Sequence, residues 1–147
     1  MDKAEVSNVQ EWSIVERLPS PADYNRVREL VGWGTYDEDV IAGSLPQSLY
    51  CVCAEIDGEV VGMARVIGDG GMVFYVQDVI VVPGHQRRGI GTQMMDRAMA
   101  YVAAHAYHNS IVGLMAAKGK EAFYIRYGFV ARPTDTLGAG MIMFWKA

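Results

Sequence analysis

The sequence predicts an α/β domain with one mixed β-sheet and helices on its faces. Three β-rich segments, separated by turn signals at Asp57-Gly58 and at residues 68–71, form an antiparallel meander. A long helical segment and a short apolar strand follow, in the order of a parallel crossover unit. The chain has 147 residues, of which 51% are hydrophobic and 20% charged, which suits one folded domain with a core. We therefore expect a single domain over residues 1–147.

A strand and two helices are expected before the meander. The strand covers Gln10 to Arg17, and the first helix covers Ala22 to Val31, because Ser20 and Pro21 suit a helix start. A second, short helix is expected over Tyr36 to Ser44. Acidic residues crowd its first turn, where the helix dipole favours negative charge.

The meander leads directly into the crossover unit. Its strands are expected over Leu49 to Ile56, Glu59 to Ile67 and Met72 to Val82. Apolar side chains then recur at helical spacing from Ile90 to His105, which predicts the longest helix. A short strand over Ile111 to Met115 follows this helix and completes the crossover.

The end of the chain predicts a short helix and two closing strands. The helix covers Lys120 to Tyr127 and ends at Gly128. The strands cover Phe129 to Arg132 and Met141 to Trp145, on either side of a glycine-rich turn. Together these elements would complete the mixed sheet.

Composition and charge exclude several functions. A formal net charge of −4 argues against a nucleic-acid-binding surface, which needs clustered Lys and Arg. No apolar stretch of about 18 residues could span a membrane, and the first residues lack the apolar core of a signal peptide. Cys51 and Cys53 are expected to be core thiols, since two cysteines form neither a zinc site nor a disulfide framework. We expect a cytoplasmic protein with no metal, no nucleic-acid partner and no membrane partner.

The most informative motif joins the end of the meander to the long helix. A β-branched strand breaks at Pro83-Gly84, and the chain enters the helix through Gln86-Arg87-Arg88-Gly89-Ile90-Gly91. The glycines let the backbone approach an anion, the helix start directs free N–H groups at it, and the arginines add charge. The motif is not a P-loop, which needs Gly-Lys-Ser/Thr, nor a Rossmann fingerprint, whose third glycine is replaced by Met94. It predicts a pyrophosphate site.

Two separate segments resemble one protein family. The pattern [Gln/Arg]-x-x-Gly-x-Gly at Gln86 to Gly91 resembles that of the GNAT superfamily of acyl-CoA-dependent N-acyltransferases, and Ala122 to Phe129 is similar to the family's late helix. The plant and bacterial branch that acetylates aralkylamines such as serotonin is similar in finer detail, at Ala64-Arg65 with Asp69, at Asp78 to Gln86, and at the closing Gly140-Met141 with Phe144-Trp145. The resemblance runs from about Leu49 to the end of the chain. It implies a mixed antiparallel and parallel sheet that is splayed at its central strand and flanked by about four helices.

The resemblance also implies the donor and where it binds. Acetyl-CoA would lie with its pantetheine arm along the central strand and its pyrophosphate on the glycine loop. A backbone N–H near Ile80 or Val81 is the expected donor to the acetyl oxygen, where negative charge develops. The residues expected to bind the coenzyme are Val79, Ile80, Val81, Gln86, Arg87, Arg88, Gly89, Ile90, Gly91 and Thr92.

Two side chains are candidates for proton transfer. Tyr124 occupies the position of the family's general acid, although it could instead only pack against Phe123; Tyr127 is the alternative acid. Asp78 is the best-placed carboxylate to act as base toward the acceptor amine, and the other interpretation is a polar anchor for the strand. His85 is assigned to the phosphate loop.

The expected function is transfer of the acetyl group from acetyl-CoA directly to a primary amine of a small molecule. The alternatives are acetylation of protein lysines or N-termini, and a non-catalytic module that binds acyl-CoA. Family members often dimerise, so a homodimer is one expected assembly. The residues expected around the acceptor are Trp33, Tyr36, Asp37, Glu38, Asp39, Met141, Met143 and Trp145.

Overall fold

The computed structural model describes residues 11–147. The chain divides after Val112 into two compact units. The first carries almost all of the regular secondary structure, and the second begins at Gly113 and carries one short helix. The expectation of one domain over residues 1–147 stays a prediction.

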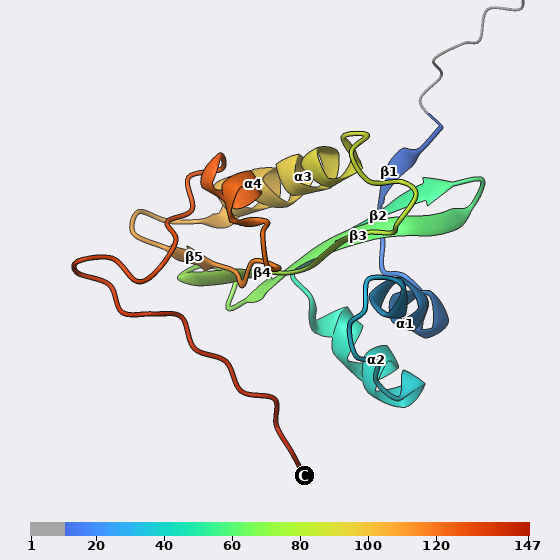
Figure 1. Ribbon diagram of the computed structural model, residues 1–147, viewed down its shortest axis with the longest axis horizontal. Coiled ribbons are helices and arrows are strands. Elements are labelled where there is room, and N and C mark those ends of the chain that lie inside the picture. Colours follow the sequence, from blue (N-terminus) through green and yellow to red (C-terminus); the bar gives the residue numbers. More distant parts are fainter. Residues whose placement is uncertain (1–10) are drawn as a thin grey trace, which may run out of the picture. The chain divides into compact units, whose positions relative to one another are not determined.

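The first unit is built on a five-stranded sheet in the order β1-β2-β3-β4-β5 (Figure 1). Strands β1 to β4 are antiparallel neighbours, and β5, which follows the long helix, makes the sheet mixed. This confirms the predicted fold class. The elements are β1 (Ser13–Glu16), α1 (Pro21–Leu30), α2 (Glu38–Ser44), the 3₁₀ helix η1 (Leu45–Gln47), β2 (Tyr50–Ile56), β3 (Glu59–Gly68), β4 (Val73–Val81), α3 (Ile90–His105) and β5 (Ile111–Gly113).

The local signals at helix starts are confirmed. Ser20 caps α1, its side chain accepting a hydrogen bond from the Asp23 N–H, and Glu38 and Asp39 lie in the first turn of α2. Helix α3 has the predicted bounds. The strand predicted from Gln10 is β1, and Gln10 itself lies outside the described residues. The short helix η1, with Pro46 in its first turn, follows α2 and was not predicted.

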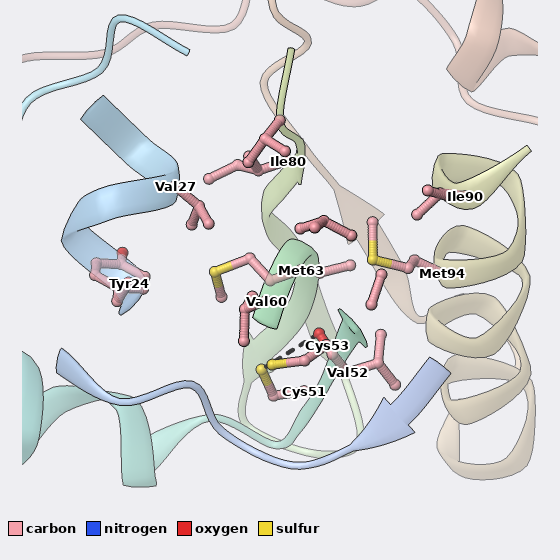
Figure 2. Packing of buried hydrophobic residues seen from close by; sticks show 14 of the residues in the cluster. Tyr24, Val27, Cys51, Val52, Cys53, Val60, Met63, Ile80, Ile90 and Met94 are labelled. Atoms are coloured by element: carbon pink, nitrogen blue, oxygen red, sulfur yellow. Dashed lines mark hydrogen bonds between the residues drawn. The ribbon is translucent and has the colours of Figure 1, made fainter. Parts of the chain in front are cut away.

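The core lies on both faces of the sheet. Figure 1 shows α3 along one face and α1 with α2 along the other. Tyr24 and Val27 of α1 and Ile90 and Met94 of α3 are buried in one cluster with strand residues such as Met63 between them (Figure 2). The sheet is therefore covered on both sides, as an α/β fold requires.

The two cysteines belong to this core. Cys51 and Cys53 are both buried in β2, and the Cys51 thiol contacts the Val52 carbonyl (Figure 2). The contact with Cys53 and burial raise the pKa of the Cys51 thiol, so this thiol stays protonated. The prediction of core thiols is confirmed.

Strand β4 carries a bulge in its middle. The β3–β4 register pairs Met63 with Ile80 but Arg65 with Gln77, so β4 has one extra residue there. The extra residue is at Asp78, whose φ of +57° is left-handed. A bulge bends its strand and redirects the side chains around it.

The second unit contains α4 (Glu121–Ile125) and its surroundings. Tyr124 is the buried residue of this helix. Its ring makes edge contacts with Phe123, 5.0 Å between centroids, and with Phe129, 6.3 Å between centroids. The predicted late helix is thus present, over a shorter range than Lys120 to Tyr127.

The two predicted closing strands are wrong. Neither Phe129 to Arg132 nor Met141 to Trp145 forms a strand, although Thr134 and Leu137 close the predicted turn through a hydrogen bond of 2.8 Å. The residues from Met141 to Trp145 are 68–88% exposed. Apolar and aromatic composition favours a strand, but a strand also needs a backbone partner, and neither segment has a ladder partner among residues 11–147.

Candidate active site

One edge of β4 is largely uncovered by its neighbour β5. The Ile111 N–H donates to the Met72 carbonyl at 2.8 Å, just before β4 begins. Strand β5 has three residues, whereas β4 has nine and continues to Val81. Only the beginning of β4 therefore pairs with β5, as a sheet splayed at this strand requires.

The orientation of the backbone decides which N–H groups face that edge. Val82 donates its N–H to the Val61 carbonyl of β3 at 2.9 Å. Successive N–H groups along a strand point to opposite edges, so the N–H groups of Val81 and Val79 point away from β3. Of the two expected donors to the acetyl oxygen, Ile80 and Val81, this orientation favours Val81.

The loop after β4 has the backbone geometry of an anion site. Gly84 and Gly89 have φ of +92° and +94°, and Arg87 between them has φ of +63°. Helix α3 starts at Ile90, and its first internal hydrogen bond joins the Gln93 N–H to the Gly89 carbonyl. The N–H groups of Ile90 and Gly91, which precede this bond, have no carbonyl partner within the helix. A Cβ at Gly84 or Gly89 would meet no atom within 4 Å, so an anion can approach this backbone closely.

Two side-chain hydrogen bonds fix this loop to its neighbours. Gln86 donates its Nε2 to the Val81 carbonyl at 2.8 Å, which ties the loop to the end of β4. Trp12 donates its indole N–H to Gln93 Oε1 at 3.1 Å, which ties the first turn of α3 to the start of the described chain. The predicted site residue Gln86 thus braces the loop with its side chain.

The two arginines of the loop have different surroundings. Arg88 donates to Glu11 at 3.1 Å, contacts His85 Nδ1 at 3.2 Å, and lies 5.1 Å from the Trp12 ring centroid. Arg87 is exposed and has no hydrogen-bond or ion-pair partner among residues 11–147. Arg87 is therefore the arginine that is available to a phosphate.

Asp78 lies in a buried cluster of charged side chains. Its side chain is 0% exposed. Arg28 Nη1 donates to Oδ1 at 2.6 Å, and Arg65 Nε and the Tyr24 hydroxyl donate to Oδ2 at 2.8 and 2.7 Å. Burial and the Asp78 carboxylate raise the pKa of Tyr24 to about 12, so its hydroxyl keeps the proton that it donates. Both carboxylate oxygens are occupied, and these contacts favour the anchor role of Asp78 over the base role.

The partners of Asp78 were not found from the sequence. Arg65 and Asp78 each interrupt an apolar, β-branched strand, and a charge inside such a strand has to be paired when it is buried. That interruption was the available signal. It does not identify Tyr24 or Arg28, which come from α1.

The loop between α1 and α2 lies against the same cluster. Arg28 donates its Nε to the Gly34 carbonyl at 2.7 Å, and its guanidinium carbon lies 5.4 Å from the Trp33 ring centroid and 5.2 Å from that of Tyr36. Trp33 and Tyr36 are two of the residues predicted around the acceptor. The structure therefore brings them to the bulge of β4.

Tyr124, the predicted general acid, lies in the second unit. Burial raises its pKa, which keeps the hydroxyl protonated and also makes it a weaker acid than an exposed tyrosine. Its edge contact with Phe123 also matches the packing role left open for it. Tyr127, the alternative acid, lies 5.6 Å from the Phe123 ring centroid. The acid role of Tyr124 stays a prediction.

Among residues 11–147 no three or more His, Cys, Asp or Glu side chains are grouped as metal ligands would be. Within the same range, every helix is too short or too polar to cross a membrane.

Taken together, the mixed sheet, the edge of β4 that β5 leaves unpaired and the glycine loop define an α/β protein whose central strand leads through a glycine loop into a helix. A family model described as an acetyltransferase (GNAT) domain matches residues 47–131, which is more than half of the chain. The protein therefore belongs to the GNAT acetyltransferase family. The matched range contains β4, the glycine loop and α4, so the family resemblance seen in the sequence is confirmed.

Solved structures agree with this assignment. A protein of unknown function from meticillin-resistant Staphylococcus aureus, described as a probable acetyltransferase, is 28% identical with a TM-score of 0.84, over 91% of this chain and 99% of that one. A GNAT-family acetyltransferase from Streptococcus pneumoniae is 29% identical with a TM-score of 0.75, over 92% and 99% of the two chains. Glucosamine-6-phosphate N-acetyltransferase from Arabidopsis thaliana, 16% identical with a TM-score of 0.66 over 92% and 99%, shares the fold.

Proposed function

We propose that the protein is an acetyl-CoA-dependent N-acetyltransferase that acts directly on a primary amine of a small molecule. The observation that carries this proposal is the continuity of the open β4 edge at Val79 to Val81 with the left-handed loop that starts α3. Pantetheine contains amide groups that can pair with a free strand edge, and the pyrophosphate needs the backbone N–H donors of the loop. The two features follow each other along the chain in the order in which the coenzyme needs them.

The chemistry is attack of the amine nitrogen on the thioester carbonyl carbon. The new C–N bond forms as the C–S bond breaks, and coenzyme A leaves as a thiolate. The backbone N–H of Val81, directed away from β3, is our candidate donor to the carbonyl oxygen as its negative charge develops. This contact needs no side chain, which fits a stretch made of Val79, Ile80 and Val81.

Two protons have to move during the reaction. By the family resemblance, we assign protonation of the departing sulfur to Tyr124; the thiol has a reference pKa of about 8.5, so this step is helpful rather than indispensable. An acceptor alkylammonium, with a pKa of ~10.4, has to lose a proton before attack. Because both oxygens of Asp78 are occupied by Arg28, Arg65 and Tyr24, we assign this proton to water.

The transfer is direct, without an acyl-enzyme intermediate. A cysteine-linked route needs an accessible thiolate, whereas Cys51 and Cys53 are buried in β2 and the pKa of Cys51 is raised.

The test is acetyl transfer to defined amines. The protein is incubated with acetyl-CoA and a library of small primary amines, with lysine-containing and free N-terminal peptides in a parallel arm, and thiol release and product masses are measured. We expect acetylated small amines, and none with the Gly89→Glu variant, whose carboxylate occupies the anion loop. Acetylation of peptides alone would favour the protein acetyltransferase alternative. Coenzyme binding without thiol release in any arm would identify a binding module.

The role of Tyr124 is tested with a matched pair of variants. Tyr124→Phe removes only the hydroxyl and is expected to lower kcat by at least about 10-fold while leaving the coenzyme A Kd unchanged. Tyr127→Phe, in the turn that follows α4, should change neither. If Tyr127→Phe alone lowers kcat, Tyr127 is the acid.

A further inference from the structure

We propose that Arg28 is a positioning residue that fixes the α1–α2 loop, residues 31–37, to the bulge of β4, and so holds Trp33 and Tyr36 as one wall of the acceptor site. The proposal rests on the proposed function for the existence of that acceptor site. The attachment itself rests on contacts within the first unit, each of which the structure gives.

The bulge itself shows that the side chain of Asp78 has a role. Among residues 11–147, Asp78 is the one non-glycine residue with a positive φ inside a strand; the others lie in turns and loops. Glycine is the usual residue at a left-handed bulge position, and another residue costs about 1 kcal/mol there. The chain nevertheless has a carboxylate at this point. What the carboxylate adds is its bonds to α1 and β3.

Neutralising Asp78 requires only one of its two arginines. Arg65, from the neighbouring strand β3, already donates to Oδ2 and is itself held by Ser48 at 3.1 Å. Arg28 adds a second guanidinium whose side chain is only 10% exposed. Burying this further charge costs several kcal/mol unless well-formed hydrogen bonds offset the cost. The role of Arg28 therefore lies in the hydrogen bonds that it makes rather than in its charge.

Arg28 makes bonds in two directions. Its Nη1 donates to Asp78 in β4 at 2.6 Å, and its Nε donates to the Gly34 carbonyl of the loop at 2.7 Å. Its own backbone carbonyl accepts the Trp33 N–H at 2.9 Å. A single residue thus joins the α1–α2 loop to the strand that carries the proposed coenzyme edge.

The same guanidinium also contacts three aromatic rings, two in the loop and one in α1. Its carbon lies 5.2 to 5.5 Å from the ring centroids of Tyr24, Trp33 and Tyr36, within the range of cation–π contacts. Asn25 holds the Tyr36 backbone, donating Nδ2 to its carbonyl at 2.7 Å and accepting its N–H at 3.1 Å. Tyr36 as a residue remains 54% exposed, so it is fixed at its backbone and still accessible to a ligand.

These contacts have a functional consequence that can be measured. The loop is attached to β4 at the bulge, whereas the glycine loop is attached at the end of the strand through Gln86. Loosening the first attachment should weaken binding of the acceptor and leave binding of the coenzyme unchanged.

The primary variant is Arg28→Lys. Lysine keeps the positive charge, but one ammonium cannot reproduce the planar fork that reaches both Asp78 and Gly34. The matched control is Arg26→Lys on the same helix: Arg26 also donates to a backbone carbonyl, that of Val60 at 2.7 Å, and also contacts carboxylates. Arg26 touches neither the bulge nor residues 31–37 in any of these contacts.

The first readout is amide hydrogen exchange of residues 31–37, which needs no acceptor. We expect at least a 10-fold faster exchange in Arg28→Lys and no change in Arg26→Lys. The second readout uses an amine from the library that is acetylated. Its KM should rise at least 10-fold in Arg28→Lys, with kcat within 3-fold and the coenzyme A Kd, measured by calorimetry, within 2-fold.

Arg28→Met is the second variant if Arg28→Lys does not fold. Methionine removes both bonds of the guanidinium, while Arg65 and the Tyr24 hydroxyl still satisfy Asp78, so the same loosening of residues 31–37 is expected. Wild-type exchange of the loop in both variants overturns the attachment. An equal loss of coenzyme and acceptor affinity overturns the acceptor-wall role. If no amine is acetylated, the proposed function and the acceptor wall fail together, while the exchange comparison still decides the attachment.

Discussion

The glycine loop and the Asp78 cluster are built on the same strand in opposite ways. The loop, residues 83–91, is a run of consecutive, mostly exposed residues whose left-handed glycines present backbone groups. The cluster is buried, and its side chains come from α1, β3 and β4. A site made of backbone belongs to one stretch of sequence and can be recognised there. A site made of side chains from distant segments exists only after the chain has folded. Removing a side chain of the Asp78 cluster should therefore first lower the stability of the fold and loosen the segments that the cluster joins.

The largest expected effect is a difference in the free energy of unfolding between a variant of the Asp78 cluster and a variant of the glycine loop. Asp78→Ala leaves Arg28 and Arg65 buried without their carboxylate and is expected to lower the free energy of unfolding by about 3–5 kcal/mol. Gly89→Ala places the same methyl group in a left-handed conformation in the exposed loop, at a cost of about 1 kcal/mol. Urea unfolding of both variants measures the difference. Equal losses would mean that backbone strain, and not the ion pairs, dominates at Asp78.

The next effect concerns the affinity for coenzyme A, for which the large loss is expected in the glycine loop. Gly89→Glu places a carboxylate at the start of α3 and is expected to weaken coenzyme A binding at least 100-fold, or about 2.7 kcal/mol. The control is Gly58→Glu in the β2–β3 turn, where the glycine has a similar φ of +79° and also has open space around it. Calorimetric titration with coenzyme A compares them. A Kd in Gly89→Glu equal to that of Gly58→Glu would remove the anion role of the loop.

The sequence predicted the elements whose signals are local. Turn residues such as Asp57-Gly58 and the apolar spacing from Ile90 to His105 specify the meander and α3 without reference to other segments. The glycine loop is predictable for the same reason, since its conformation depends on its own residues. The family motif added the coenzyme, which spacing alone could not name.

What was missed depends on partners distant in the sequence. Arg28 and Asp78 are 50 positions apart, and nothing near either residue indicates the other. The same limit explains the incorrect strands at Phe129 to Arg132 and Met141 to Trp145: their composition favours extended chain, but composition does not provide a pairing edge. The sequence points to Asp78 because of its carboxylate and its place on the central strand. It does not show the hydrogen-bond donors to this carboxylate, which favour the anchor role.

A smaller effect tests how strongly the Asp78 cluster raises the pKa of the Tyr24 hydroxyl. Because the pKa of Tyr24 rises from 10 in the unfolded chain to about 12 in the folded protein, its contribution to stability is complete below pH 10 and is lost as the pH rises toward 12. The loss should approach about 2 kcal/mol. Unfolding measured from pH 9 to 12 should show this alkaline decline in wild type and a shallower one in Tyr24→Phe. The exposed Tyr107→Phe is the control and should follow wild type; a parallel decline in Tyr24→Phe contradicts the shift.

The smallest effect divides the two loop arginines. Arg87 has no partner among residues 11–147, so its charge is available to a phosphate, whereas Arg88 is engaged by Glu11, Trp12 and His85. Arg87→Ala should weaken coenzyme A binding about 10-fold at low salt and less at 1 M salt, because the contact is exposed and screened. Arg88→Ala should change the Kd less than 3-fold. It should instead speed amide exchange in residues 84–89, since it removes the contacts of the loop with Glu11 and Trp12. A larger loss of affinity in Arg88→Ala would show that the coenzyme displaces Glu11, and that the motif's second arginine, not its first, binds the phosphate.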